Sequence, residues 1–226
     1  MSISPKAALM EEYALVARAL SAPARLSLLE QIAQGERGVE ALADKAGLTI
    51  ANASQHLQQL RRAGLVTSRR EGKSVFYRLS DGKTLALMDM IGVVAASNLA
   101  QVERILRGLS DGVAAPEPVT RAELAARLVK GPVTLFDVRP PDEFAMGHIP
   151  GAQNVSLADL DGIALTLDTN SAIIAYCRGP YCVYAYQAVT MLRKRGLNAR
   201  RLEGGFPEWR EDGRPLALAS SGSGHV

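Results

Sequence analysis

Two cysteines, Cys177 and Cys182, have the clearest potential for chemistry in this chain of 226 residues. They bound the run CRGPYC, which follows the apolar segment 172–176 and precedes a stretch with helical periodicity. A thiol between the end of a strand and the start of a helix faces unpaired N–H groups and the positive end of the helix dipole. Arg178 adds a positive charge beside it. These features favour thiolate over thiol, so we predict that Cys177 is a nucleophile with a lowered pKa.

The four residues between the cysteines set the shape of the loop beside that nucleophile. Gly179 would let the loop curl into a concave nest of N–H groups, whereas Pro180 has no N–H to give. Four intervening residues can bring the two Cα atoms within the roughly 4.4–6.8 Å that a disulfide requires. Two alternatives stay open: Cys177 is a buried structural cysteine, or Cys182 only packs under its helix.

Cysteine and histidine usage limits the other kinds of site. Two cysteines cannot build a disulfide framework, so a disulfide here would be transient and functional. None of the three histidines, His56, His148 and His225, has ligand spacing to the cysteines, so we expect neither a metal nor a cofactor. No apolar run approaches the roughly 20 residues that cross a bilayer, and acids interrupt the N-terminal apolar segment. We therefore expect a cytoplasmic protein without a membrane partner.

The elements that must hold the cysteine loop follow from the pattern of the second half of the chain. Helices and strands alternate there, which predicts an α/β domain with a mostly parallel sheet. Before it, residues 108–119 hold two Gly and two Pro, a composition typical of a linker, and the final run ASSGSGHV is predicted to be disordered. The predicted helices are 121–129, 181–195 and 207–210, and the predicted strands are 133–138, 172–176 and 199–202. A loop and a further short helix are predicted between the first two strands.

The first half of the chain has a mainly helical pattern. A short helix, a turn containing Gly47, a second helix that Thr49 can cap, and a basic hairpin are typical of a winged helix-turn-helix. On the helix after Thr49, we expect Ile50, Ala53, Leu57 and Leu60 to face the core. The predicted helices are 5–20, 23–34, 39–46, 50–63 and 83–107, and the predicted strands are 65–70 and 74–79.

The other face of that capped helix suits the edges of DNA bases. It carries small and amide side chains, and Asn and Gln can pair bidentately with adenine. Residues 61–78 add six Lys and Arg against the single acid Glu71, which predicts contact with phosphates. The predicted DNA-contacting residues are Thr49, Ala51, Asn52, Ser54, Gln55, His56, Gln59, Arg62, Arg69, Arg70 and Lys73.

The runs SQHLQQLRRAGLV (54–66) and GKSVFYRLS (72–80) resemble the ArsR family of dimeric bacterial transcription regulators, over about residues 10–107. The resemblance implies dimerisation through the first and last helices. Many members bind metals through Cys or His in the third or last helix, but neither residue type occurs there, so metal sensing of that sort is not expected. The last predicted helix has an apolar stripe that suits a dimer seam, although it could also be core: Met88, Ile91, Ala95, Leu99, Val102 and Leu106.

Three runs in the second half, FDVRPPDEFAMGHIPGAQNV (136–155), AIIAYCRGPYC (172–182) and LEGGFPEWREDGRPL (202–216), resemble a single-domain rhodanese. The resemblance implies that Cys177 accepts a sulfane sulfur and becomes a persulfide. Arg178 and Cys182 are the other catalytic candidates, and Gly179, Pro180 and Tyr181 complete a cradle around Cys177. By the same resemblance Asp137, Arg139 and His148 organise neighbouring loops, and Trp209 belongs to the core.

The loop departs from the common rhodanese pattern CRxGxR, because its sixth position is Cys182 and not a basic residue. Losing that charge weakens the site for a dianion such as thiosulfate, so neutral or singly charged persulfides are the expected donors. Val183 stands where an Arg would serve related phosphatases and arsenate reductases, which argues against phosphate or arsenate chemistry. After Cys177 gains a sulfur, Cys182 is expected to attack and give a disulfide with release of sulfide, or a trisulfide.

The sequence therefore predicts two domains, a mainly-α winged helix-turn-helix followed by an α/β rhodanese-like domain. The expected ranges are 1–108 for DNA binding and dimerisation, 109–116 for the linker, 117–218 for the rhodanese-like domain and 219–226 for the tail. The leading hypothesis is a transcriptional regulator, expected to be a repressor, that senses sulfane sulfur. Its expected partners are double-stranded DNA with an inverted repeat, a second copy and small sulfane-sulfur donors. The alternatives are a sulfurtransferase tethered to DNA, or a repressor whose non-catalytic module binds a partner or arsenite through its thiols.

Overall fold

A computed structural model describes residues 4–109, 117–168, 171–180 and 182–218 of the chain. Its backbone divides into two compact units, Met1–Met88 and Asp89–Val226. The division falls inside helix α5 (Gly82–Asn98), so the boundary at residue 108 stays a prediction. Leu109, the first residue of the predicted linker 109–116, is the last residue of helix α6 (Ala100–Leu109). The rest of the predicted linker and the predicted tail 219–226 lie outside the described residues.

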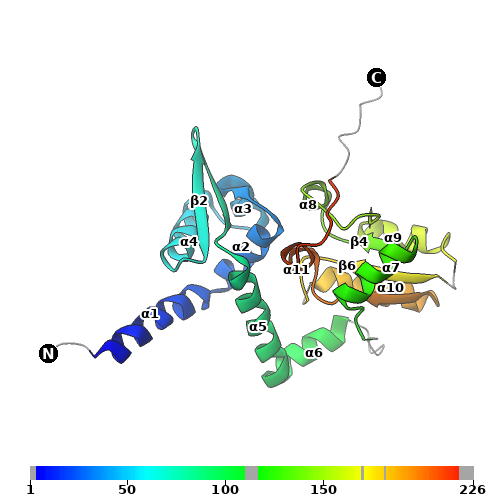
Figure 1. Ribbon diagram of the computed structural model, residues 1–226, viewed down its shortest axis with the longest axis horizontal. Coiled ribbons are helices and arrows are strands. Elements are labelled where there is room, and N and C mark those ends of the chain that lie inside the picture. The colour runs from blue at the N-terminus through cyan, green and yellow to red at the C-terminus, as the bar shows by residue number, and fades with distance from the viewer. Residues whose placement is uncertain (1–3, 110–116, 169–170, 181, 219–226) are drawn as a thin grey trace. The chain divides into compact units, whose positions relative to one another are not determined.

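The first unit has the order of elements that the sequence predicts (Figure 1). Four helices precede an antiparallel hairpin whose register pairs Glu71 with Ser74, which leaves a two-residue turn at Gly72 and Lys73. Gly72 has φ +58°, a left-handed conformation that glycine adopts without strain. A short third strand, β1 (Arg37–Gly38), which the sequence does not predict, pairs with β3. The elements are α1 (Pro5–Leu20), α2 (Pro23–Gln34), α3 (Val39–Lys45), α4 (Ile50–Arg62), β2 (Val66–Glu71) and β3 (Ser74–Leu79).

The core of this unit gathers residues from the four helices α1 to α4 and from the hairpin of β2 and β3. Ala53, Leu57 and Leu60 of α4 are fully buried, as predicted. The prediction for Ile50 is wrong, because its side chain is 53% exposed. Ile50 is the first residue of α4, and helical side chains lean toward the N-terminus. Its side chain therefore extends beyond the part of the helix that packs on the core.

The single long helix predicted over 83–107 is also wrong. Two helices, α5 and α6, take its place, with a bend of 98° between them at Leu99. Ser97 and Asn98 precede the bend, and such residues compete for backbone hydrogen bonds. The Asn98 side chain donates to the Val94 carbonyl oxygen at 2.8 Å. The predicted apolar stripe is therefore interrupted, and its members Ile91 and Leu99 are exposed.

Within the described residues, no single helix is long and apolar enough to cross a bilayer. Only α5 and α6 together, as a bent pair, pass that test of length and composition.

The second unit contains a parallel four-stranded sheet with the order β5-β4-β6-β7, which confirms the α/β prediction (Figure 1). Residues of β6 alternate between two cores: Ile173 and Ala175 enter one, and Ile174 and Tyr176 enter the other. This period of two means that both faces of the sheet are covered. The strands are β4 (Thr134–Asp137), β5 (Gln153–Asn154), β6 (Ala172–Tyr176) and β7 (Asn198–Arg201).

The helices of this unit cover the sheet, and α10 begins directly after Cys182. Trp209 is buried in the core, as predicted. The predicted start of a helix at Tyr181 lies outside the described residues; Cys182 donates its N–H to the Gly179 carbonyl oxygen, and the described helix begins at Val183. Between β4 and β6 the sequence predicts one short helix, whereas the structure has two, α8 and α9, and the strand β5, which the sequence does not predict. The helices are α7 (Arg121–Lys130), α8 (Pro141–Ala145), α9 (Leu157–Ala164), α10 (Val183–Lys194) and α11 (Phe206–Glu211).

Candidate functional site

The two cysteines lie at the carboxyl end of β6 and at the start of α10. Cys177 follows the last residue of β6, and Cys182 is the N-cap of α10. A disulfide joins them, with their Cα atoms 6.1 Å apart, inside the range expected from the sequence. Both residues are buried in this oxidised state. The loop that the disulfide closes, residues 177–182, is called the cysteine loop below, and its Tyr181 lies outside the described residues.

The backbone of the cysteine loop packs directly on the start of α11. The Phe206 N–H donates to the Cys177 carbonyl oxygen at 3.0 Å. A Cβ atom on Gly205 would lie 2.5 Å from that oxygen and 2.5 Å from the Gly179 nitrogen, so only glycine fits there. Gly179 is not among the glycines with positive φ, so a left-handed conformation at this residue does not shape the loop.

Arg178 forms a bidentate ion pair with Glu143 of α8, with Nη2 to Oε1 at 2.7 Å and Nε to Oε2 at 2.9 Å. Glu143 is fully buried. From the sequence, the positive charge of Arg178 is expected to stabilise the Cys177 thiolate. This expectation needs correction, because a buried carboxylate balances that charge. The start of α10 remains as the feature that favours a thiolate at this position.

Asp137 and Arg139 form a second buried ion pair at the end of β4. The Arg139 guanidinium contacts both Asp137 carboxylate oxygens and donates to the Gly147 carbonyl oxygen at 2.7 Å. His148 stacks on Phe144, with ring centroids 3.7 Å apart. These contacts connect β4 with the segment after α8. Burial raises the pKa of the neighbouring Tyr176, whose hydroxyl oxygen accepts a hydrogen bond from the Ile149 N–H.

Two further charged residues beside the cysteine loop were not predicted. Glu208 of α11 is buried, and its Oε2 accepts a hydrogen bond of 2.6 Å from the Gly205 N–H. Burial raises the pKa of Glu208 to about 7. Arg201, at the end of β7, donates to the Pro180 carbonyl oxygen at 3.2 Å, and its guanidinium lies 3.7 Å from the Tyr186 ring centroid.

The recognition surface of the first unit differs in part from its prediction. Ala51, Asn52, Gln55 and Arg62 are exposed on α4, and Thr49 caps the helix by accepting from the Asn52 N–H at 3.2 Å. Ser54, His56 and Gln59 are half-buried. Gln59 accepts a hydrogen bond of 2.8 Å from Arg25, and the His56 Nδ1 atom is buried without a hydrogen-bond partner in the described part of the chain. Gln59 and His56 are therefore less suited to contact DNA than the four exposed residues.

The wing, meaning the hairpin of β2 and β3, presents Arg70 and Lys73 as exposed cations. Arg69 is different, because it forms ion pairs with Glu36 at 2.7 Å and with Glu71 at 2.5 Å. Hydrogen bonds to these two acids raise the pKa of Arg69. The count of charged residues over 61–78 leaves out Glu36, because Glu36 is distant in the sequence. That count therefore overstates the positive charge of the wing.

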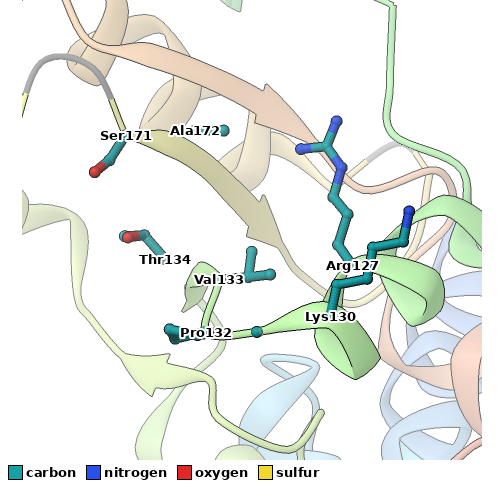
Figure 2. Close-up of a pocket in the computed structure, with 8 residues that line it drawn as sticks. Arg127, Lys130, Pro132, Val133, Thr134, Ser171 and Ala172 are labelled. Atoms are coloured by element: carbon teal, nitrogen blue, oxygen red, sulfur yellow. The ribbon is translucent and has the colours of Figure 1, made fainter.

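Surface pockets of the second unit lie at both edges of the sheet. One pocket lies at the amino ends of β4 and β6, opposite to the edge from which the cysteine loop leaves (Figure 2). It contains Arg127, Lys130 and Thr134. A second pocket lies at the carboxyl ends of β4 and β5, the edge that also carries the cysteine loop. It is lined by Val138, Arg139, Pro140, Pro141, Asn154, Ser156, Leu157, Asp159 and Tyr184.

Comparison with known proteins assigns both halves of the chain. The family model of the rhodanese-like domain matches residues 120–212, and that of a helix-turn-helix domain matches residues 20–69. The chain is 43% identical over 212 residues to the HTH-type transcriptional regulator Rv0324 of Mycobacterium tuberculosis, which covers 93% of this chain and 92% of that protein. It is also 41% identical over 80 residues to the biofilm growth-associated repressor of Agrobacterium fabrum, covering 35% of this chain and 68% of that protein.

Two solved structures resemble the separate halves. One is the homodimeric winged helix-turn-helix domain of Mb0332 from Mycobacterium bovis, with 40% identity, a TM-score of 0.40, and 44% of this chain and 92% of that chain covered. The other is a rhodanese-related protein from Thermoplasma volcanium, with 27% identity, a TM-score of 0.41, and 46% of this chain and 99% of that chain covered.

Proposed function

We propose, on the premise that this chain belongs to the ArsR-type helix-turn-helix transcriptional regulators and carries a C-terminal rhodanese-like domain, that it is a repressor that senses sulfane sulfur. The observation that carries the proposal is the position of the two cysteines, whose Cα atoms lie 6.1 Å apart across one loop. A regulator that binds DNA must reach the chromosome, so the cytoplasm is its expected location.

The proposed chemistry has two steps. The Cys177 thiolate attacks the outer sulfur of a persulfide RS–SH, so that a Cys177–S–SH persulfide forms and the thiolate RS⁻ leaves. The Cys182 thiolate then attacks Cys177 Sγ and displaces HS⁻, which gives the Cys177–Cys182 disulfide. A small-molecule thiol as reductant returns the disulfide to two thiols. The proximity of Cys182 to Cys177 supports the second step.

The proposed switch acts on the first turn of α10. A Cys177 thiolate or persulfide places negative charge near the N-terminus of this helix, where the helix dipole favours it. The disulfide removes that charge and ties the N-cap of α10 to the end of β6. The two redox states therefore differ in charge and in covalent connection, and a change in DNA affinity requires such a difference.

The DNA-binding form is proposed to be a homodimer on an inverted repeat. Helices α1 and α5 expose large apolar side chains that a second copy would cover, among them Leu9, Met10, Tyr13, Met90 and Val94. A two-fold axis would place two copies of α4 in successive major grooves. Arg70 and Lys73 would contact the phosphates beside each groove.

Mass spectrometry combined with DNA binding tests the proposal. The reduced protein is treated with hydrodisulfide, HSS⁻, and its mass and its affinity for a DNA fragment selected from a random pool are followed together. We expect the parent to end as the Cys177–Cys182 disulfide with a parallel change in affinity, and Cys182→Ser to retain one added sulfur on Cys177. Modification of Cys177 without a change in the parent's affinity would instead support a sulfurtransferase tethered to DNA, the second function that the rhodanese match favours. A parent that forms no disulfide, together with a Cys182→Ser protein that gains no sulfur, would contradict both functions.

A further inference from the structure

Glu208 places an acidic side chain beneath the cysteine loop. Its residue is 7% exposed, and its Oε1 atom lies 3.6 Å from the position that a Cβ would occupy on Gly179. Its other oxygen, Oε2, is fixed by the Gly205 N–H. The side chain is thus held at the start of α11 with one oxygen directed at the middle of the loop.

The Oε1 atom of Glu208 is buried and has no hydrogen-bond partner among the described residues. A carboxylate that only capped α11 would need just the bond from Gly205. Leaving a buried carboxylate oxygen unsatisfied costs free energy, so a purely structural role explains the residue poorly. Its charge is also weakly screened, because water is excluded around it.

The cations near Glu208 and the cysteine loop are engaged with other groups. Arg121 of α7, which acts on Glu208, is paired with Asp212 at 2.8 Å, and the Arg210 guanidinium lies 5.6 Å from the Phe206 ring centroid. Arg178 is balanced by the buried Glu143. Arg201 donates to the Pro180 carbonyl oxygen and lies over the Tyr186 ring, on the β7 side of the loop. At the sixth loop position, Cys182 carries no positive charge. An ionised Glu208 therefore adds a negative charge beside the cysteine loop, where a negatively charged sulfur donor must approach Cys177.

We infer that Glu208 determines the specificity of the cysteine loop, because its carboxylate disfavours reagents with more negative charge relative to those with less. This inference deepens the proposed function and rests on it for the identity of the natural donor. Thiosulfate would have to bring two negative charges to Cys177, giving Cys177–S–S⁻ and sulfite. Hydrodisulfide would bring one, and attack by the same thiolate would give Cys177–S–S⁻ and HS⁻.

Charge selection can be measured without any sulfur donor. In a Cys182→Ser background, Cys177 is alkylated by iodoacetamide, which is neutral, and by iodoacetate, which carries one negative charge. Both form the same Cys177 Sγ–CH₂ bond and release iodide. The ratio of the two rates therefore reports the electrostatic potential at the loop, because the fraction of Cys177 thiolate cancels. The assay is run at about pH 8, where most of Glu208 is ionised, since its pKa is about 7.

Glu208→Gln removes the charge and keeps an oxygen for the Gly205 N–H. We expect this substitution to raise the iodoacetate-to-iodoacetamide ratio by on the order of tenfold, and to raise the thiosulfate-to-hydrodisulfide ratio in the same direction. Glu211→Gln is the matched control, because Glu211 is an exposed acid of the same helix. We expect Glu211→Gln to leave both ratios unchanged, and Glu208→Asp to stay near the parent.

An unchanged alkylation ratio in a folded Glu208→Gln protein would overturn the inference, and so would a Cys177 that neither reagent reaches. If the alkylation ratio changes but neither sulfur donor modifies Cys177, the inference holds and the proposed function fails. The two failures are therefore distinguishable.

A second measurement needs no substitution at Glu208. The charged groups that act on it are Arg121 of α7, Asp89 of α5 and Arg210 of its own helix. Neither alkylating reagent changes its charge between about pH 6 and 8.5, so the ratio should fall as the pH rises through about 7, where Glu208 ionises. A ratio that stays constant over this interval would contradict the inference.

Discussion

The backbone N–H of Phe206 donates a hydrogen bond of 3.0 Å to the carbonyl oxygen of Cys177. This bond brings the start of α11 against the cysteine loop so closely that Gly205 has no room for a side chain. The shape of the loop therefore depends on a segment nearly thirty residues further along the chain, as well as on the strand and helix that it joins.

Gly205→Ala should deform the cysteine loop. The added methyl group would meet backbone atoms of Cys177, Arg178 and Gly179, which cannot move as a flexible side chain does. We expect a loss of about 1–3 kcal/mol in the free energy of unfolding and slower modification of Cys177. Trp209, the only tryptophan of the chain, makes the unfolding of this unit visible by fluorescence. Gly162→Ala is the control, since nothing lies within 4 Å of its Cβ position; equal losses in the two variants would refute the packing argument.

Arg178→Gln should destabilise the same unit strongly. The substitution removes the cation that balances the buried carboxylate of Glu143, and breaking such a pair costs about 3–5 kcal/mol. Arg195→Gln breaks an exposed pair with Asp161 and should cost less than about 1 kcal/mol. Urea unfolding followed by Trp209 fluorescence compares the two. A cost for Arg178→Gln as small as that for Arg195→Gln would contradict the structural role of the pair.

Glu208 should make the stability of its unit depend on pH. Burial raises its pKa from 4.5 to about 7, so the folded protein holds a proton that the unfolded chain releases. The free energy of unfolding should therefore fall as the pH rises from about 4.5 to 7, by roughly 3 kcal/mol, and change little from this cause above pH 7. Glu208→Gln should lack this decrease. A stability difference between parent and variant that is the same at about pH 4 and pH 8 would show that the Glu208 pKa is ordinary.

The two arginines of the wing should differ in their contribution to DNA binding. Arg70 is exposed, and its guanidinium contacts only the Gly72 carbonyl oxygen in the described residues, whereas Arg69 is already paired with Glu36 and Glu71. Arg70→Ala should weaken binding to all DNA sequences and reduce the salt slope by about 1. Arg69→Ala should have a smaller effect. Titrations of specific and unrelated DNA at several salt concentrations would measure both, and identical salt slopes for the two variants would contradict this distinction.

The sequence alone predicts those features that depend on neighbouring residues. The order of β6, the cysteine loop and α10, and the capping of α4 by Thr49, follow from residues a few positions apart. The break at Leu99 was missed, because the apolar periodicity continues across it.

The charges at the cysteine loop could not be predicted in the same way. Arg178 pairs with a residue 35 positions away, and Gly205 and Glu208 meet the loop only after the sheet has formed. The signal was nevertheless present, because Glu143, Gly205 and Glu208 all lie inside the runs that resemble a rhodanese. Arg201 lies outside those runs, and only the structure places it beside Pro180.

The central claim is that Cys177 and Cys182 together convert sulfane sulfur into a change in DNA affinity. The most direct test measures the dissociation constant for a selected operator fragment, before and after hydrodisulfide treatment, in the parent and in Cys182→Ser. We predict that the parent forms the Cys177–Cys182 disulfide and changes its affinity by about 5- to 150-fold, whereas Cys182→Ser stops at the Cys177 persulfide and keeps its affinity. A Cys182→Ser protein that responds as the parent does would contradict the two-thiol switch and leave Cys177 acting alone.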